Sequence, residues 1–217
     1  MPGFGALWYA TRSLPNIDFI QLLIWLLILI GSLTVHEAAH AWAADRLGDP
    51  TARNLGRLSL NPAVHIDPIG TLLFPLISIL TNLPLIGWAK PVPVSMAALR
   101  PRYRQKFMVI AAAGPASNLV LAVLAAILVQ FLASSSPMSP VLYAALTTNV
   151  YLAVFNMVPV PPLDGGNVLA GVLSGPLADA FDRLRPYGFV ILYGLMLSGL
   201  LSTIAWPVAD TVVGWLL

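Results

Sequence analysis

The sequence predicts an all-α polytopic membrane protein, a bundle of about four to six transmembrane helices with a re-entrant or extended segment near residues 68–98. Of the 217 residues, 58% are hydrophobic and 9% are charged, whereas an ordinary soluble domain carries about 25% charged residues. Several uncharged stretches are long enough to cross a bilayer, which takes about 20 residues as a helix. These spans must be helical, because lipid cannot satisfy an open backbone.

The first two apolar stretches differ in regularity. Residues 19–35 are almost wholly apolar, and the stretch continues to residue 44 through a short polar interruption. Residues 68–89 carry no charge, but Pro75 and Pro84 break them, and proline interrupts a regular helix. Non-helical backbone at membrane depth is tolerated where it is buried in protein or lines water. The second stretch is therefore a candidate for a broken or re-entrant segment.

The later stretches complete the predicted bundle. Residues 107–163 hold no charge and are long enough for two spans, with a turn rich in serine and proline at 134–140 between them. Residues 187–209 are also uncharged. They carry Tyr187 and Trp206 near their ends, where interfacial aromatic residues tend to lie.

Length and charge favour one domain and exclude some partners. We expect a single membrane-embedded domain over residues 1–217, with a catalytic core at about 19–170 and a helical C-terminal segment at 187–217. The net charge is +2, and no basic tract with interleaved aromatic residues is present, so no nucleic acid partner is expected. The chain has no cysteine, so any metal must be held by nitrogen and oxygen ligands.

Basic residues indicate which loops face the cytoplasm. Five of them precede the third stretch: Lys90, Arg100, Arg102, Arg104 and Lys106. The positive-inside rule places this loop in the cytoplasm, and the two spans that follow return the chain to the same side near Asp164. If residues 19–44 and 68–89 both crossed the membrane, His36 would lie on the opposite side. We therefore expect residues 68–89 to re-enter the membrane rather than cross it.

Ionisable residues inside the apolar stretches mark the candidate site, because charged groups are costly in a membrane. Glu37 is the only glutamate in the chain, and it lies between His36 and His40. The two histidines are four residues apart, so they share one helical face and can bind one metal ion. Glu37 is offset from the two histidines around the helix axis, where it can reach a water molecule bound to that ion. This is the spacing of a zinc-binding H-E-x-x-H motif, in which Glu37 is the general base for hydrolysis.

The helix does not supply a third metal ligand. A catalytic zinc takes three protein ligands and leaves one position for water, and the candidates for the third ligand are Asp164 and His65. Asp164 follows three prolines within residues 159–162 and precedes two glycines, so the chain there cannot be a regular helix and can turn sharply. We prefer Asp164, because an unpaired carboxylate is costly in a membrane, and we expect one Zn²⁺ per chain.

Other interpretations of these residues stay open. His36 and His40 can instead form hydrogen bonds within the bundle. A transporter also combines broken helices with buried ionisable groups, but no two related halves are visible in the sequence. A catalytically inactive scaffold would lack a ligand or the base, and neither is missing. Two histidines and one carboxylate also suit iron.

Three motifs follow one another along the chain. They are His-Glu-Ala-Ala-His at 36–40, Gly-Pro-Ala-Ser-Asn at 114–118 and Asn-x-x-Pro-x-x-Pro-x-Asp-Gly at 156–165. Together they resemble the site-2 protease family of intramembrane metalloproteases, over about residues 31–170. Shorter blocks at residues 56–68 and 87–94 resemble the compact bacterial and archaeal branch of that family.

The resemblance implies a zinc site on the cytoplasmic side and the hydrolysis of single-pass transmembrane proteins. It also makes Asn118 a candidate catalytic residue that orients the substrate or polarises the scissile carbonyl. Many relatives carry a PDZ or CBS domain, and we expect neither here. The expected setting is the lipid bilayer of a prokaryotic cell, as an integral protein of its inner membrane. The sequence leaves a homo-oligomer open.

Two further features have alternative interpretations. Residues 90–95 carry prolines at 91 and 93, which favour an extended chain. This segment is either a plain loop or an edge that pairs with an unwound substrate as an added strand. Asn156 either supports the metal site or forms a hydrogen bond between helices.

Overall fold

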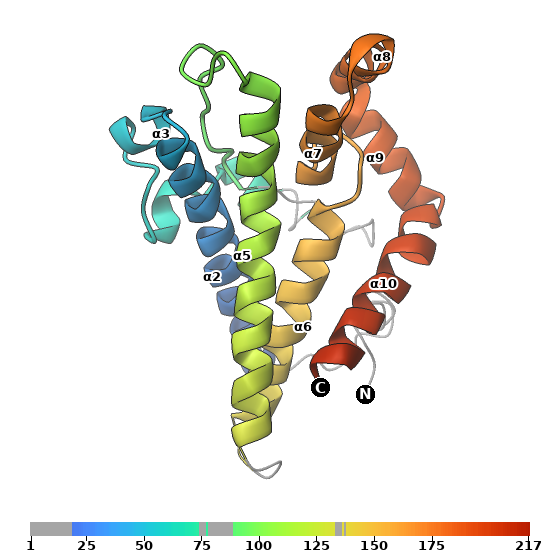
Figure 1. The fold of residues 1–217 in the computed structure, drawn as a ribbon. Helices are drawn as coiled ribbons and strands as arrows, with labels where there is room; N and C mark the ends of the chain where they lie inside the picture. Colours follow the sequence, from blue (N-terminus) through green and yellow to red (C-terminus); the bar gives the residue numbers. More distant parts are fainter. Residues whose placement is uncertain (1–18, 74–76, 78–88, 133–135, 137) are drawn as a thin grey trace.

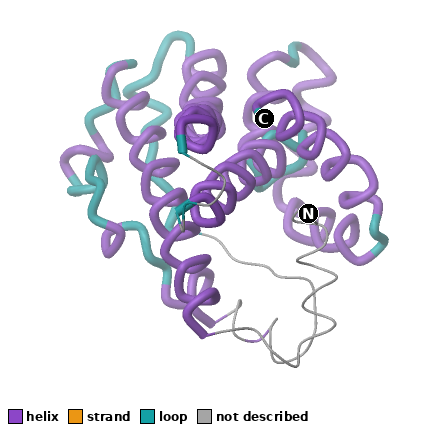
Figure 2. Tube along the Cα trace, turned by 90° about the horizontal axis from the view of Figure 1, so that it is seen from below, coloured by secondary structure: helices purple, strands orange, loops and turns teal. Residues whose placement is uncertain are grey.

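The computed structural model describes residues 19–73, 77, 89–132, 136 and 138–217. This part of the chain contains helices and loops and no strand (Figures 1 and 2). The all-α expectation is therefore confirmed. The predicted re-entrant path of residues 68–89 lies largely outside the described residues, which include a π-helical turn, Pro68–Leu73, at its start.

α2 (Phe19–Arg46) is one of two described helices that are long and apolar enough to cross a membrane. Its candidate span is Leu23–Arg46. The helix ends at Arg46, and Gly48 two residues later has a φ of 98°, in a region that L side chains rarely adopt. Two short elements follow, α3 (Thr51–Asn54) and the 3₁₀ turn η2 (Pro62–Val64).

α5 (Tyr103–Phe131) is the second such helix and lies at the centre of the bundle (Figure 1). It packs against α2, α6 (Ser139–Asn156) and α7 (Asp164–Val172). Small side chains on α5 allow α6 to approach closely. The shared core contains Ala122, Ala125 and Ala126 of α5 with Leu146 and Val150 of α6.

The predicted helical segment at 187–217 contains two described helices with a sharp bend between them. α8 (Gly175–Leu184), η4 (Arg185–Tyr187) and α9 (Gly188–Leu197) are followed by α10 (Leu200–Leu216). The chain bends by 78° between Leu197 and Leu200, at Gly199 with a φ of 75°. If this bent pair counts as one span, the described residues hold three candidate spans. The expected total of four to six stays a prediction.

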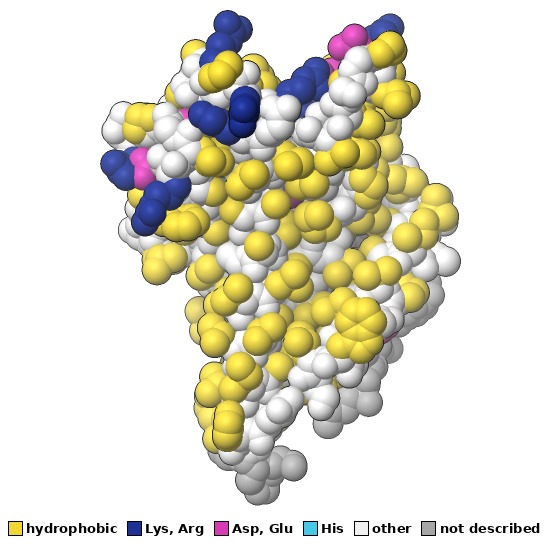
Figure 3. Space-filling model, viewed as in Figure 1, with side chains coloured by type: hydrophobic (Ala, Val, Ile, Leu, Met, Phe, Trp, Pro, Cys, Tyr) yellow, Lys and Arg dark blue, Asp and Glu magenta, His cyan; other side chains and the backbone are white. Residues whose placement is uncertain are grey.

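Charge and apolar surface are segregated along the molecule. Lysine and arginine side chains gather at the end where α5 begins and where α8 lies, and the surface toward the other end is largely hydrophobic (Figure 3). Apolar side chains on the outer face of α5 are exposed: Val120, Val123, Leu124, Ile127 and Leu128. A surface of this kind suits lipid.

Candidate metal centre

α2 carries the two histidines on the face that meets α5. Their rings lie edge to face, with centroids 4.6 Å apart and planes at 85°, as expected for residues one helical turn apart. Both are buried, and Glu37 between them is 9% exposed. A carboxylate oxygen of Glu37 and one nitrogen of each ring lie within 4.8 Å of one another.

α5 fixes the orientation of both rings through their Nδ1 atoms. His40 Nδ1 lies 2.7 Å from the backbone oxygen of Ile110, and His36 Nδ1 lies 2.6 Å from Asn118 Oδ1. Both oxygens can only accept, so each Nδ1 carries the proton and donates. Each Nε2 atom faces Asp164 Oδ2, and an Nε2 that carries no proton presents the lone pair with which imidazole binds a metal.

Gly114 is the point of α5 closest to the two rings. A Cβ atom added there would lie 2.5 Å from His36 Nε2 and would also collide with His40 Nε2. The missing side chain therefore leaves space in front of both metal-binding atoms. Ile110, Gly114 and Asn118 are spaced by four residues, so one face of α5 provides a hydrogen bond, a gap and a second hydrogen bond.

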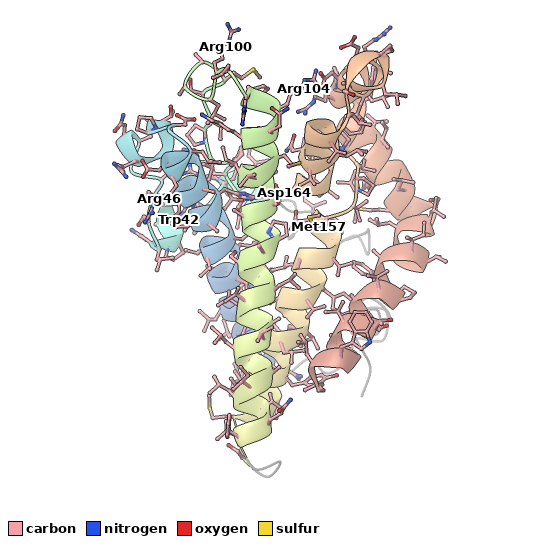
Figure 4. All side chains as sticks on the ribbon, in the orientation of Figure 1. Trp42, Arg46, Arg100, Arg104, Met157 and Asp164 are labelled. Carbon is pink, nitrogen blue, oxygen red and sulfur yellow. The ribbon has the colours of Figure 1, made fainter. Side chains whose placement is uncertain are left out.

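Asp164 reaches the same space from a different part of the chain. It is the first residue of α7, after the proline-containing loop that follows α6. Side chains at Gly165 and Gly166 would collide with the backbone of this loop, at 2.5 Å from Val158 O and 2.7 Å from Pro161 N. The two glycines therefore allow α7 to start directly against the loop, at mid-height of the molecule (Figure 4).

The carboxylate of Asp164 approaches both imidazoles with one oxygen. Its Oδ2 lies 3.0 Å from His36 Nε2 and 3.3 Å from His40 Nε2. Ligands of a tetrahedral zinc at ~2.0–2.1 Å from the ion are about 3.3 Å apart. The distances, the nitrogen and oxygen donors and the gap at Gly114 therefore fit a single zinc ion.

The structure places the other predicted residues as follows. Asn118 is fully buried, and besides His36 it contacts the side chain of Asn149, with Nδ2 to Oδ1 at 2.8 Å. These contacts give Asn118 a role in orienting His36, and its action on a substrate stays a prediction. Asn156 donates to the Leu152 backbone of its own helix at 3.0 Å.

His65 belongs to a loop. Its Nε2 lies 2.8 Å from the Ser59 carbonyl oxygen, and its own carbonyl accepts a hydrogen bond from Lys90 N at 2.8 Å. Among the described residues, the group of metal-ligating atoms within 4.8 Å of one another comprises His36, Glu37 and His40, with neither His65 nor Asp164. Asp164 Oδ2 lies beside both histidine Nε2 atoms, and the choice of Asp164 over His65 as the third ligand stays a prediction.

Residues 89–95 form no helix and are held from one side by buried charged groups. The Arg57 guanidinium donates to the Lys90 and Pro91 carbonyls. Asp49 Oδ2 accepts from Ser95 N at 2.6 Å. The backbone N–H groups of Val92 and Val94 make no hydrogen bond to a described residue.

Sequence reasoning gave no role to Gly114, Asn149 or Ser32. Gly114 lies in a quoted motif, but only the packing of α5 on α2 shows why a side chain is excluded. Asn149 is a polar residue inside an apolar stretch, and Ser32 lies one helical turn before His36. A search for polar residues at helix spacing from the motif could have found both.

Comparisons with known proteins agree with these features. A model of peptidase family M50 matches residues 132–197. The chain is 33% identical over 191 residues to the "Putative zinc metalloprotease YwhC" of Bacillus subtilis, with 84% of each chain covered. It is 31% identical over 209 residues to the "Putative zinc metalloprotease Rip2" of Mycolicibacterium smegmatis, which covers 91% of this chain and 76% of that protein. No solved structure gives a significant match.

The fold and the site define a helical membrane protein with a buried H-E-x-x-H centre. The chain belongs to peptidase family M50. The resemblance to site-2 proteases predicted from the three motifs is thereby confirmed.

Proposed function

We propose that the chain is a zinc metalloprotease that hydrolyses peptide bonds of single-pass transmembrane proteins within or at the edge of the bilayer. The observation that carries the proposal is the approach of one Asp164 oxygen to His36 Nε2 at 3.0 Å and to His40 Nε2 at 3.3 Å. The names of the curated relatives support the same chemistry. His36, His40 and Asp164 are the proposed ligands of one zinc ion per chain.

The proposed reaction divides the work between the metal and Glu37. Zinc at this site supplies a Lewis acid that activates water and polarises the substrate carbonyl. Glu37 takes the proton from the attacking water and gives it to the leaving amine. Its carboxylate is suited to this role because it is buried and lies beside the two histidines. The Ile110 carbonyl and Asn118 keep the rings in the required tautomer.

The proposed location of the site is near the cytoplasmic surface of the inner membrane. The basic end of the molecule lies where α5 begins (Figure 3), and basic loops stay in the cytoplasm. Gly114 lies 11 residues after Tyr103, the first residue of α5, which is ~16 Å along a helix. The reacting bond would therefore lie inside the membrane but close to the cytoplasmic side.

A transmembrane substrate must unwind before its peptide bonds become accessible, because helical backbone is already hydrogen-bonded. Residues 90–95 are the proposed edge for the unwound segment. Arg57 and Asp49 hold this stretch to the protein, and the N–H groups of Val92 and Val94, which make no hydrogen bond to a described residue, are the proposed donors to an added strand.

Metal analysis and cleavage of transmembrane peptides test the proposal. Purified protein is assayed for zinc and iron and then incubated with a panel of transmembrane peptides. Glu37→Gln should keep about one zinc per chain and lose hydrolysis, because the base is removed and the ligands stay. Asp164→Ala should lose both, because the third ligand is gone.

Asp179→Ala is the matched control for Asp164→Ala, since Asp179 is an exposed carboxylate on α8. It should keep both zinc and activity. Full hydrolysis by Glu37→Gln, or full zinc in Asp164→Ala, would contradict the proposal. Iron in place of zinc would point to redox chemistry instead.

A further inference from the structure

A cavity with a charged rim lies at the basic end of the molecule, apart from the proposed metal centre. Its volume is about 240 Å³, several times the ~30 Å³ that one water molecule takes up in the liquid. None of the proposed zinc ligands lines it. The polar part of its lining comes from α5, α7, α8 and η4: Arg104, Asn167, Asp182 and Arg185.

One carboxylate holds the two arginines of this cavity in place. Arg104 Nη2 donates to Asp182 Oδ2 at 2.6 Å, and Arg185 Nε donates to Asp182 Oδ1 at 3.0 Å. Arg185 Nη1 also donates to Asn167 Oδ1 at 3.0 Å. Arg104 thus lies between the start of α5 and the segment formed by α7 and α8 (Figure 4). Because these bonds already order both guanidinium groups, a ligand that binds them loses little free energy in ordering side chains.

The charge and the remaining donors of the cavity suit an anion. Two guanidinium groups and one carboxylate leave a net charge of one positive. A guanidinium has five N–H donors, and Arg104 Nε and Arg185 Nη2 make no hydrogen bond to a described residue. The three charged side chains are 36–39% exposed, so a ligand can reach them. Guanidinium groups match the oxygens of a phosphate in geometry as well as in charge.

The position of both arginines along their helices corresponds to the level of lipid headgroups. Tyr187, two residues after Arg185, is an exposed aromatic residue, and the exposed apolar side chains of α9 begin directly after it. On α5 the first large apolar side chain that is exposed is Val109, which lies ~7.5 Å along the helix from Arg104. Both guanidinium groups therefore lie just outside the apolar surface, where the phosphates of a bilayer are found.

The apolar wall of the cavity favours a lipid over a free phosphate ion. Met96, Tyr103 and Phe107 line it, and the two aromatic rings are stacked with centroids 5.6 Å apart. We propose that this cavity binds a phosphate-bearing anion, namely the headgroup of an anionic phospholipid whose glycerol and first methylene groups contact this wall. The site joins α5, α7 and α8, so an occupied site stabilises that end of the bundle. It is separate from the metal centre, and its occupancy does not depend on peptide hydrolysis.

The test uses the full chain in a nonionic detergent and measures the unfolding temperature during titration, because a ligand that binds the folded protein raises this temperature. The probes are short-chain phosphatidylglycerol, short-chain phosphatidylcholine and inorganic phosphate. We expect phosphatidylglycerol to bind most tightly, because phosphatidylcholine has no net charge and inorganic phosphate has no apolar part. Arg104→Gln and Arg185→Gln should each weaken this binding about tenfold or more, the effect of losing a hydrogen bond to a charged group.

Arg183→Gln is the matched control, because Arg183 is an exposed arginine of α8 that does not line the cavity. It removes the same charge and should weaken binding about fivefold at most, the contribution of one basic residue near an anionic surface. If a glutamine variant does not fold, Arg185→Lys replaces it. Lysine keeps the charge but lacks the planar fork of arginine, so this variant should also bind phosphatidylglycerol less tightly than the parent.

Two results would overturn the proposal. The first is an equal loss of binding in Arg183→Gln and Arg185→Gln, which would show a general attraction between charges. The second is equal binding of phosphatidylcholine and phosphatidylglycerol by the parent protein. Inorganic phosphate that binds with the affinity of phosphatidylglycerol would overturn the choice of a lipid and assign the cavity to free phosphate.

Discussion

Replacement of Gly114 by alanine is the sharpest test of the metal centre. The added methyl group would lie 2.5 Å from His36 Nε2 and against His40 Nε2. A zinc ion would stand ~2.0–2.1 Å from the same two atoms. The methyl group and the ion therefore compete for nearly the same space.

The size of the effect follows from these distances. Non-bonded atoms in contact are ~3.5–4.0 Å apart, so relief of the clash requires the rings or α5 to move by about 1 Å. Metal sites tolerate changes in ligand distance of about 0.2 Å. We expect the affinity for zinc to fall more than about 100-fold, beyond the range for an outer partner. Overpacking alone should cost about 1–3 kcal/mol of stability.

The assay measures zinc per chain after purification in detergent, and thermal unfolding with and without a chelator. Gly31→Ala is the control, because it lies on α2 with no atom within 4 Å of the added methyl group. It should bind zinc like the parent. Gly114→Ala should contain almost no zinc, and a chelator should not change its unfolding temperature. A Gly114→Ala protein that holds one zinc per chain with the parent affinity would refute the reasoning.

Three further predictions concern contacts outside the metal centre. Burial raises the pKa of Asp49, but hydrogen bonds from Thr51 and Ser95 outweigh burial and hold the pKa below the ordinary value for aspartate. The resulting stabilisation is complete above about pH 4, the pKa of an unfolded aspartate, and is lost as pH falls through the lowered pKa. The protection of the Ser95 amide against hydrogen exchange, taken relative to the unfolded chain at the same pH, should therefore fall in acid, and Asp49→Asn should remove this pH dependence of the protection. Arg57→Met should leave the zinc content unchanged and lower peptide cleavage, because the guanidinium holds the Lys90 and Pro91 carbonyls. Cleavage at the rate of the parent protein would show that residues 90–95 do not bind the substrate. Tyr151→Phe should destabilise the protein by about 1–3 kcal/mol, measured by thermal unfolding, because its hydroxyl donates to Asp210 of α10; Tyr193→Phe should have little effect.

The sequence was sufficient for those parts of the fold and site that depend on local spacing or on the cost of burying charge. The apolar stretches predicted α5 and α6 within a few residues. The i, i+4 spacing predicted that His36 and His40 share a face. The isolated carboxylate at the end of the apolar residues 107–163 predicted that Asp164 would approach them, and the structure brings them together.

Other features depend on contacts between distant segments, and sequence patterns do not contain them. The break at Gly199 lies in an uncharged stretch that resembles one span, and only the positive φ there shows the bend. The role of Gly114 depends on how closely α5 meets α2. Asn149 and Ser32 are 117 residues apart in sequence, and their contact requires both helices to be packed on α5.

α5 explains how a polar centre is tolerated inside an apolar bundle. Buried polar groups are costly unless they are hydrogen-bonded, and α5 supplies a partner for the outer nitrogen of each histidine. The same helix also positions the carboxylate, because Gly171 of α7 packs directly against Met108 of α5 with no room for a side chain. All three proposed ligands are therefore placed relative to one rigid helix. A shift of α5 would therefore move all three proposed ligands. A change in the loops that precede and follow α5 would leave the distances between the ligands intact.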